Sequence, residues 1–413
     1  MNIHLQKFSM MKNKLAFVLI LPLLCSCNNN SNSELSDGAV DFANIETTES
    51  CSNKYEVIDI DNAENLTESE FYSTYVEDIQ ITKISDYRPM KPISRVCLDN
   101  KNIYALSDDK VYVFDKKTGE YQYCIDYKGH GHKEYISISD IQVIPQKKEL
   151  LCLSDTQRKL FRISTENGKV KNVENILAGA PFILEVGDYT YYQFAYGTGL
   201  NKKETWLLMK SDSTHFIKKA VEIQPIQKMN YLAKGMYLHN NILTFVPVYS
   251  DTIYHVNTNE DRIKPVYVIQ DKQSLWKQHK TEFNPGEIYE YAIKNGKNYL
   301  EADHFFETKN CILFTMISND AQRGYPILKE YLYCKNKHKT YLLDVNSYPN
   351  IPVAAPFPTM VASDNNHFFG LLTNVEMLKD YEHYNMITNQ KLSDIAKNSQ
   401  EGDNPIFITL KLK

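Results

Sequence analysis

Residues 103–125 read IYALSDDKVYVFDKKTGEYQYCI. They contain three short runs rich in aromatic and aliphatic residues, and the two connections between the runs carry Asp, Lys and Gly, which are typical of turns. Short runs of this kind that are joined by tight turns form an antiparallel meander. The stretch therefore predicts three consecutive strands of one small sheet.

The same arrangement returns in residues 150–168, which read LLCLSDTQRKLFRISTENG. The tripeptide Leu-Ser-Asp at 106–108 recurs at 153–155, a spacing of 47 residues, and Gly119 recurs as Gly168, a spacing of 49. A period in the forties with about four strands in each repeat is typical of a β-propeller, in which every repeat forms one blade.

Later parts of the chain contain further strands of the same kind. These blades are expected at 182–219, 236–269, 304–345, and 360–372 together with 406–412. The early run Tyr55–Ile60 is left over, and we expect it to close the ring by pairing with the last blade, because closure removes open sheet edges. The predicted fold is all-β, a six-bladed β-propeller of four-stranded antiparallel blades over residues 51–413.

Two segments interrupt the strand pattern. Residues 271–303 include an expected helix around Ile288–Lys294, and residues 374–399 carry apolar residues at helix-like spacings. We expect helical insertions between or within the later blades. Packing against the propeller is one role for them, and covering a ligand site is the alternative.

The N-terminus has the pattern of a bacterial lipoprotein signal. Basic residues precede an apolar run over 15–24, and Ser26 stands directly before Cys27. The run is too short to span a membrane as a helix. Cleavage before a cysteine that then receives lipid accounts for the pattern. We expect a signal peptide over 1–26 and lipid on Cys27, which is a better acceptor than Cys25 because a bulky leucine precedes the latter.

The segment that follows, 27–50, is rich in Asn and Ser and poor in apolar residues. This composition predicts a flexible tether between the lipid and the propeller. The expected location is the cell envelope, at the outer membrane or the periplasmic face, with the lipid as the contact to the membrane. The sequence leaves inner versus outer membrane open.

The composition argues against a nucleic-acid partner. The formal net charge is −5, and no basic cluster is interleaved with aromatic residues. Tyrosine is abundant, with 29 residues, which suits strands and binding surfaces.

Six cysteines remain after the signal peptide and the lipidation site, and their wide spacing is not that of a disulfide framework or a zinc site. We expect buried thiols where they lie among apolar strand residues, and an exported location also permits disulfides. If one bridge forms, Cys311 with Cys334 is the best pair, because both are expected on neighbouring strands. The six are Cys51, Cys97, Cys124, Cys152, Cys311 and Cys334.

Taken together, the chain resembles the six-bladed β-propeller lipoproteins of Bacteroidetes over nearly the whole mature sequence. At His132 and Lys133 it departs from the proline and glycine that are usual in that family. The resemblance implies a surface or periplasmic lipoprotein and no particular chemistry. It rests on VYVFD at 111–115, GHGHKEY at 129–135, SDTIY at 250–254 and DNPIF at 403–407.

No catalytic motif is present, whether a nucleophile elbow, a zinc-protease helix, a phosphate-binding loop or an EF-hand. His130, His132 and Glu134 are candidates for a metal site, because two imidazoles and a carboxylate can bind a metal. They are weak candidates, because no third ligand beside the two histidines is securely identifiable. Simple decoration of a loop is the favoured interpretation. We expect no cofactor. Binding of a Ca²⁺ ion is the alternative that the sequence leaves open.

Aromatic residues near loops give the better functional indication, because flat rings stack on sugar rings. Filling of the core is the competing role for each of them. The leading hypothesis is a lipid-anchored, non-catalytic protein that binds glycans or envelope proteins. The alternative is a propeller enzyme, a metal-dependent lyase, lactonase or hydrolase acting on carbohydrate. The candidate ligand-binding residues are Tyr196, Trp206, Trp276, Arg323 and Tyr325.

Overall fold

A computed structural model describes most of the chain after the first 44 residues. The described ranges are 45–50, 54–194, 206–228, 233–239, 242–278, 280–284, 286–320, 324–344 and 352–413. Cys27, Cys51, Tyr196 and Arg323 lie outside them. No helix in these ranges is long and apolar enough to cross a membrane.

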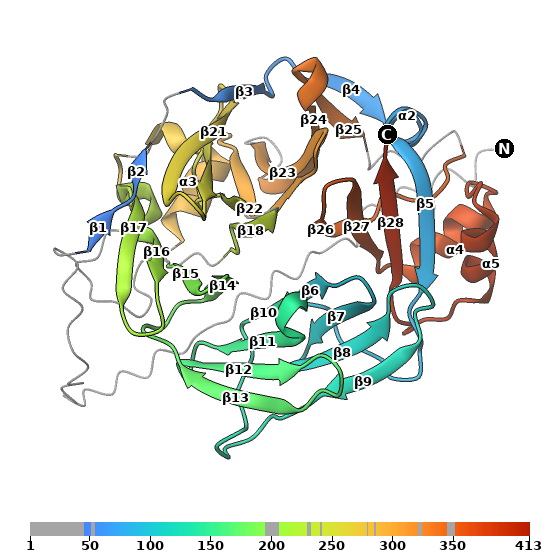
Figure 1. The fold of residues 1–413 in the computed structure, drawn as a ribbon. Helices are drawn as coiled ribbons and strands as arrows, with labels where there is room; N and C mark the ends of the chain where they lie inside the picture. Colours follow the sequence, from blue (N-terminus) through green and yellow to red (C-terminus); the bar gives the residue numbers. More distant parts are fainter. Residues whose placement is uncertain are drawn as a thin grey trace. The chain divides into compact units, whose positions relative to one another are not determined.

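The fold consists of six sheets, each of which is one blade of a β-propeller (Figure 1). Blade 1 contains β6 (Arg95–Leu98), β7 (Asn102–Ser107), β8 (Lys110–Asp115) and β9 (Tyr121–Ile125). Blade 2 contains β10 (Asp140–Ile144), β11 (Glu149–Ser154), β12 (Lys159–Ser164) and β13 (Val170–Asn175). Blade 3 contains β14 (Phe182–Val186), β15 (Tyr189–Gln193), β16 (Trp206–Ser211), β17 (Phe216–Glu222) and β1 (Glu46–Thr47).

The later blades have the same plan with additions. Blade 4 contains β18 (Met236–His239), β19 (Ile242–Phe245), β20 (Thr252–Asn257), β21 (Arg262–Gln270), β2 (Glu49–Ser50) and β3 (Glu56–Asp59). Blade 5 contains β22 (Tyr299–Glu307), β23 (Cys311–Asp320), β24 (Tyr325–Cys334), β25 (Lys339–Asp344) and β4 (Glu64–Thr67). Blade 6 contains β26 (Thr359–Ser363), β27 (His367–Leu372), β28 (Ile406–Leu412) and β5 (Val76–Lys83).

The predicted six-bladed propeller is confirmed, and so is its repeat. Gly119 and Gly168 occupy the same turn of blades 1 and 2, with φ of +77° and +68°, a left-handed conformation that glycine adopts without strain. The helix expected near Ile288–Lys294 is α3 (Glu287–Lys294). The segment 374–399 forms two helices, α4 (Val375–His383) and α5 (Gln390–Asn398).

The ring closes differently from the expectation for Tyr55–Ile60. The closing strand is β5, which pairs antiparallel with β28 from Ile406↔Lys83 to Leu412↔Val76. The residues 56–59 form β3, which instead adds a parallel strand to the outer edge of blade 4. Blade 6 thus combines three strands from the C-terminal end of the chain with one from near its start.

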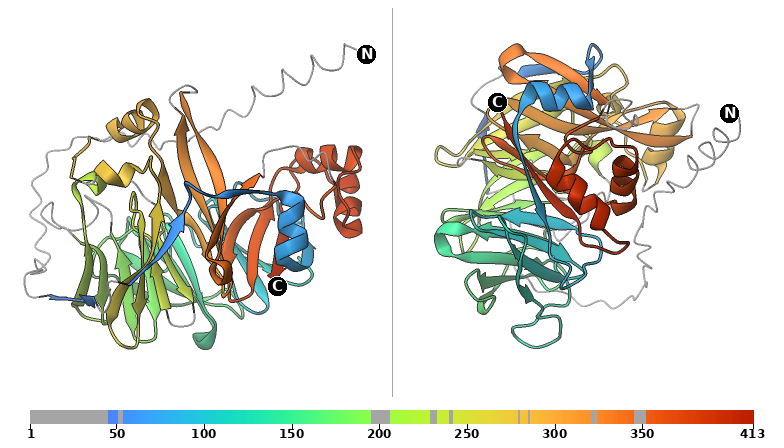
Figure 2. Two further views of the ribbon diagram at one scale, coloured as in Figure 1. Left: turned by 90° about the horizontal axis from the view of Figure 1, so that it is seen from above. Right: turned by 90° about the vertical axis from the view of Figure 1, so that its right-hand side faces the viewer.

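The segment before the closing strand runs along the outer edges of three blades. β1 pairs in parallel with β17, β2 and β3 with β21, and β4 with β25 (Figure 1). Residues 46–50, at the end of the predicted tether, therefore lie on the propeller. The segment then forms α2 (Glu68–Tyr75), which begins with a capping box: the Thr67 hydroxyl accepts from the Glu70 N–H, and the Glu70 carboxylate accepts from the Thr67 N–H. Figure 2 shows α2, α4 and α5 gathered at blade 6.

Hydrophobic clusters lie between neighbouring blades, where the faces of two sheets meet. They occur between blades 1 and 2, 3 and 4, 4 and 5, 5 and 6, and 6 and 1. Between blades 2 and 3 the Arg162 guanidinium donates to Glu185 at 2.6 Å, and Gln142 bonds the Glu185 backbone. The sheets are therefore held together by apolar packing, to which ion pairs between blades are added, such as that of Arg162 with Glu185.

The two faces of the ring differ in the length of their connections. On one face, which we call the short-turn face, the connections contain two to five residues. Among the described residues, two of these connections contain a short 3₁₀ turn, at Pro145–Lys147 and at Lys335–Lys337. On the other, the long-loop face, connections reach 28 residues between β21 and β22 and 33 between β27 and β28. Pro225–Gln227 and Leu275–Gln278 are 3₁₀ turns in these loops. Long loops on a rigid scaffold are where binding residues concentrate.

Candidate functional site

The inner strands of the blades surround a central channel. β6, β10, β14 and β18 follow one another around it, and β22 contacts β26, which contacts β6. The Tyr237 hydroxyl lies 2.6 Å from the Ala302 carbonyl oxygen and joins β18 to β22. The cavity has a volume of about 980 Å³ and is lined by residues from both ends of the inner strands. This volume lies in the range of small-molecule binding sites.

Four charged side chains meet toward the long-loop face, three of them at or just before the start of an inner strand. Arg95 is the first residue of β6, Asp140 is the first residue of β10, and Lys234 stands just before β18. Asp303 lies in β22 at an irregularity between Leu300 and Phe305. Arg95, Lys234 and Asp303 line the channel, whereas Asp140 lies behind Lys234 and Arg95. We call this group the charged mouth.

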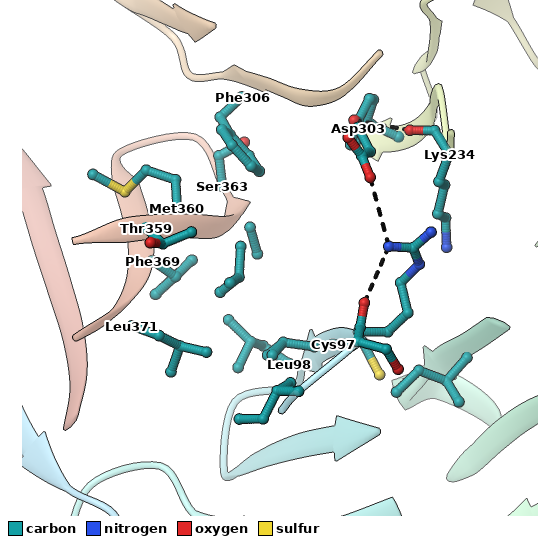
Figure 3. Close-up of a pocket in the computed structure, with 18 of the residues that line it drawn as sticks. Cys97, Leu98, Lys234, Asp303, Phe306, Thr359, Met360, Ser363, Phe369 and Leu371 are labelled. Carbon is teal, nitrogen blue, oxygen red and sulfur yellow. Dashed lines mark hydrogen bonds and ion pairs between the residues drawn. The ribbon is translucent and has the colours of Figure 1, made fainter. Parts of the chain in front are cut away.

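The pairs within the charged mouth are unequal. The Lys234 ammonium donates to both oxygens of Asp140, at 2.7 and 2.8 Å, and Asp140 is 1% exposed. The Arg95 guanidinium is looser: Nη1 lies 3.8 Å from Asp303 and Nε lies 4.0 Å from Asp140, both beyond hydrogen-bonding distance. In Figure 3 a dashed line from Asp303 marks its ion pair with Arg95.

Within the described ranges, the Arg95 guanidinium makes one hydrogen bond to a protein acceptor. Nη1 donates to the Ser94 carbonyl oxygen at 3.1 Å, and the guanidinium carbon lies 5.3 Å from the centre of the Phe182 ring. The Nε atom is buried and has no hydrogen-bond partner in the described part of the chain. A buried donor of this kind is costly unless another group accepts from it. Arg95 therefore presents guanidinium N–H groups beside the Asp303 carboxylate.

One side of the channel is apolar, whereas other parts of its wall carry polar residues such as Lys116 and Asp364. Phe306, Met360, Phe369 and Leu371 form the apolar side, and Leu98 lies near the Cys97 thiol on another (Figure 3). Burial raises the pKa of Cys97 far above that of an ordinary thiol, which keeps it neutral and unreactive. The channel therefore combines an apolar wall with a few convergent polar groups, the usual composition of a ligand site.

A second polar group lies at the other end of the channel, between blades 4 and 5. One oxygen of Glu307 accepts from Tyr267 at 2.9 Å and from Lys335 at 2.6 Å. The other accepts from His255 at 3.1 Å and from Thr244 at 3.2 Å. Burial opposes ionisation, but His255 and Lys335 outweigh it and lower the pKa of Glu307 to about 2. All its acceptor positions are engaged, so this network is structural.

The aromatic residues predicted as ligand contacts do not converge on one place. Trp206 begins β16 and carries the Lys219 ammonium 5.0 Å from its ring centre. Trp276 is half-buried against the cluster between blades 4 and 5. Tyr325 begins β24 and is 56% exposed. None of these three lines the central channel. Tyr196 and Arg323 fall outside the described residues.

The loop with His130, His132 and Glu134 has a structural use for its carboxylate. Glu134 Oε2 accepts from the Gly131 backbone N–H at 2.7 Å, while both histidines are exposed. Across the described ranges, no three metal-ligating side chains of His, Cys, Asp or Glu come together. The carboxylate thus closes the turn between blades 1 and 2.

The residues of the charged mouth were not predicted from the sequence. Arg95, Asp140, Lys234 and Asp303 are far apart in the chain and form no local motif. A signal was available nevertheless: a charged residue stands at or just before the first position of several inner strands. It could be used only with the inner strands placed, and β6 and β10 were not among the expected strands.

Comparisons with known proteins agree with the fold. A sequence model of the family described as "Domain of unknown function (DUF4934)" matches residues 55–411. The chain is similar to the crystal structure of a candidate exported protein from Bacteroides fragilis, with 20% identity and a TM-score of 0.68 over 86% of this chain and 99% of that one. A member of the duf4221 family from Bacteroides vulgatus gives 9% identity and a TM-score of 0.49 over 82% and 97%. No curated protein matches the chain.

Proposed function

The chain belongs to the DUF4934 family, and we propose that it is a lipid-anchored, non-catalytic protein of the cell envelope that binds a neutral glycan in its central channel. The observation that carries this proposal is the separation of 3.8 Å between Arg95 Nη1 and Asp303 at the charged mouth. A hydroxyl group can accept from the guanidinium and donate to the carboxylate at once, because it is both donor and acceptor. Sugars present such hydroxyls in series.

The charge balance favours a neutral ligand. The charged mouth contains two cations and two carboxylates, so its formal charge is zero. An anionic ligand would approach Asp303 as well as Arg95, and a cationic ligand would meet Lys234 as well as Asp303. Like charges brought together in a site of reduced polarity oppose binding. A neutral polyol meets donors and acceptors without this repulsion.

The apolar wall supplies the second part of a sugar site. Phe306, Met360 and Leu371 lie across the cavity from the charged mouth (Figure 3). The C–H faces of a sugar ring can pack on such side chains while its hydroxyls face Arg95 and Asp303. A glycan end that enters from the long-loop face would meet both parts.

The pairing of Asp140 favours binding over catalysis. Glycoside hydrolysis by an acid–base pair needs two carboxyl groups directed at one bond. Asp140 is buried and accepts from Lys234 with both oxygens, so Asp303 is the carboxylate of the charged mouth that faces the channel. The charged mouth thus offers the channel one carboxylate rather than an acid–base pair, and the proposal is restricted to binding.

A glycan array tests the proposal. The probe is the mature chain carrying Cys27→Ala, which keeps every residue of the propeller. We expect binding to neutral glycans that is unchanged when Ca²⁺ is removed. Binding confined to acidic glycans would contradict the charge argument. A blank array with folded protein would contradict glycan binding, and cross-linking on intact cells would then identify a protein partner.

Removing the Asp303 carboxylate separates recognition from folding. In Asp303→Ala we expect affinity for the bound glycan to fall about tenfold or more, because a hydrogen bond to a charged group is lost. The melting temperature should hardly change, because Asp303 is partly exposed and its ion pair is long. Calorimetric titration measures the affinity. The control is Glu120→Ala, an exposed carboxylate in a turn of the short-turn face, which should bind like the wild type.

The lipid anchor has its own test. Cys27→Ala should yield a folded protein that no longer partitions with membranes, because the site of lipid attachment is gone. The matched control is Cys25→Ala, which should remain in the membrane fraction. Membrane association of Cys27→Ala equal to that of the wild type would overturn the anchor assignment.

A further inference from the structure

Two cysteines lie opposite each other in blade 5, at the end of the β23–β24 pair on the short-turn face. Cys311 is the first residue of β23 and Cys334 is the last of β24, and the two are directly opposite in an antiparallel pair. Their Sγ atoms lie 3.8 Å apart. The adjacent Lys335 N–H donates to the Asn310 carbonyl oxygen at 2.9 Å, so residues 310 and 335 form a hydrogen-bonded pair.

It follows that Cys311 and Cys334 form the next, non-hydrogen-bonded pair of the ladder. Opposite Cα atoms in such a pair are about 4.5 Å apart, and their side chains approach most closely. This separation falls within the range that a disulfide spans without backbone movement. The backbone therefore already has the register that a cross-strand bridge needs.

The surroundings favour the reactive form of one thiol. Both residues are buried, with exposures of 3% and 5%. The hydrogen bond from Cys311 lowers the pKa of Cys334 below that of an ordinary thiol, against the effect of burial and with a further contribution from Tyr75. A thiolate is the nucleophile in disulfide exchange. The other cysteines in the described ranges, Cys97, Cys124 and Cys152, have no such partner thiol at contact distance.

We propose that Cys311 and Cys334 form a disulfide in the mature protein. The oxidant is a disulfide-bearing oxidoreductase or small molecule of an oxidising compartment, which export of the chain would supply. The Cys334 thiolate attacks one sulfur of the oxidant, and one oxidant thiolate leaves. Cys311 loses its proton and attacks the Cys334 sulfur, releasing the second oxidant thiolate. The two cysteines lose two electrons and two protons, and the oxidant's disulfide becomes two thiols.

The position of the pair indicates which part of the propeller the disulfide would stabilise. The Asn310 side chain donates to the Lys413 carbonyl oxygen at 2.9 Å, and the Lys413 N–H donates to the Tyr75 carbonyl oxygen at 3.0 Å. The bridge would therefore fix blade 5 beside the point where the chain ends and the closing strand begins. Because the two cysteines belong to one hairpin, the bond can form before the ring closes.

Mass spectrometry tests the bond. The full chain is exported to a bacterial periplasm through its own leader, alkylated under denaturing conditions and digested without reductant. We expect a cross-linked peptide pair containing Cys311 and Cys334, with Cys124 alkylated. Recovery of alkylated Cys311 and Cys334 after incubation with oxidised glutathione would overturn the proposal, as would a bridge between other cysteines.

A thermal measurement provides a second readout. Reduction should lower the melting temperature of the wild type by roughly 4 °C, because a bridge that closes a hairpin of this length restricts the unfolded chain. The double variant C311S/C334S should show no shift on reduction, whereas Cys124→Ser should shift like the wild type. An equal shift in the double variant would assign the effect to something other than this bond.

Discussion

Replacing Gly119 with alanine is expected to destabilise the protein by about 2–5 kcal/mol, because the new methyl group would collide with the backbone of the closing strand and the residue would keep a left-handed backbone. A Cβ at this position would lie 1.9 Å from the Lys83 carbonyl oxygen, and φ is +77°. The Gly119 carbonyl also accepts from the Ser85 N–H at 2.9 Å. The substitution therefore acts where blade 1 meets the end of β5, and urea unfolding measures its effect.

The matched control for Gly119→Ala is Gly187→Ala. Gly187 has a φ of +62°, but a Cβ there would have nothing within 4 Å. Its substitution should cost only the strain of a left-handed alanine, about 1 kcal/mol. If Gly119→Ala lowers the free energy of unfolding no more than Gly187→Ala does, the close approach of Gly119 to Lys83 does not contribute to stability.

Removal of the Glu307 carboxylate is the other change with a large expected effect. In Glu307→Ala the partly buried Lys335 and His255, whose side chains are 19% and 15% exposed, lose their shared acceptor. The expected cost is about 3 kcal/mol, the low end of the range for breaking a buried ion pair. The control is Glu77→Ala, which breaks the exposed pair of Glu77 with Lys411 and should cost under about 1 kcal/mol. Similar losses in both variants, measured by urea unfolding at pH 7, would contradict the assigned role.

The same carboxylate predicts a pH dependence. The pKa of Glu307 is lowered from 4.5 to about 2 in the folded protein. Its contribution to stability is therefore complete above pH 4.5 and is lost as the pH falls toward 2. Between pH 6 and pH 3 the wild type should lose about 2 kcal/mol more than Glu307→Ala. Equal losses in the two proteins over this interval would show that Glu307 is not held ionised by its partners.

The fold could be predicted because each repeat carries local signals. Gly119 and Gly168 need glycine for their turns, and the strands around them are apolar enough to be recognised. The closing strand escaped because β5, with the sequence VEDIQITK, is an outermost strand, and its exposed residues interrupt the apolar run. β3 looked like a better closing strand on composition alone, although it pairs with blade 4.

The site was harder to predict for a different reason. Arg95 and Asp303 are separated by more than two hundred residues and become neighbours only when the ring closes. No local pattern brings them together, whereas aromatic residues near loops stand out whether or not they converge. Tyr325 is one of these, and its exposed ring lies on the hairpin of blade 5 rather than at the channel. The Cys311–Cys334 pair, by contrast, follows from the register of a single hairpin and was named from the sequence.

The central claim is that a neutral glycan enters the channel and bridges Arg95 and Asp303. A crystal structure of the complex with the neutral oligosaccharide selected on the array tests it most directly. We expect a sugar ring in the channel, with one hydroxyl within hydrogen-bonding distance of both the Arg95 guanidinium and the Asp303 carboxylate. A sugar bound on the outer rim, with the channel unchanged, would contradict the claim.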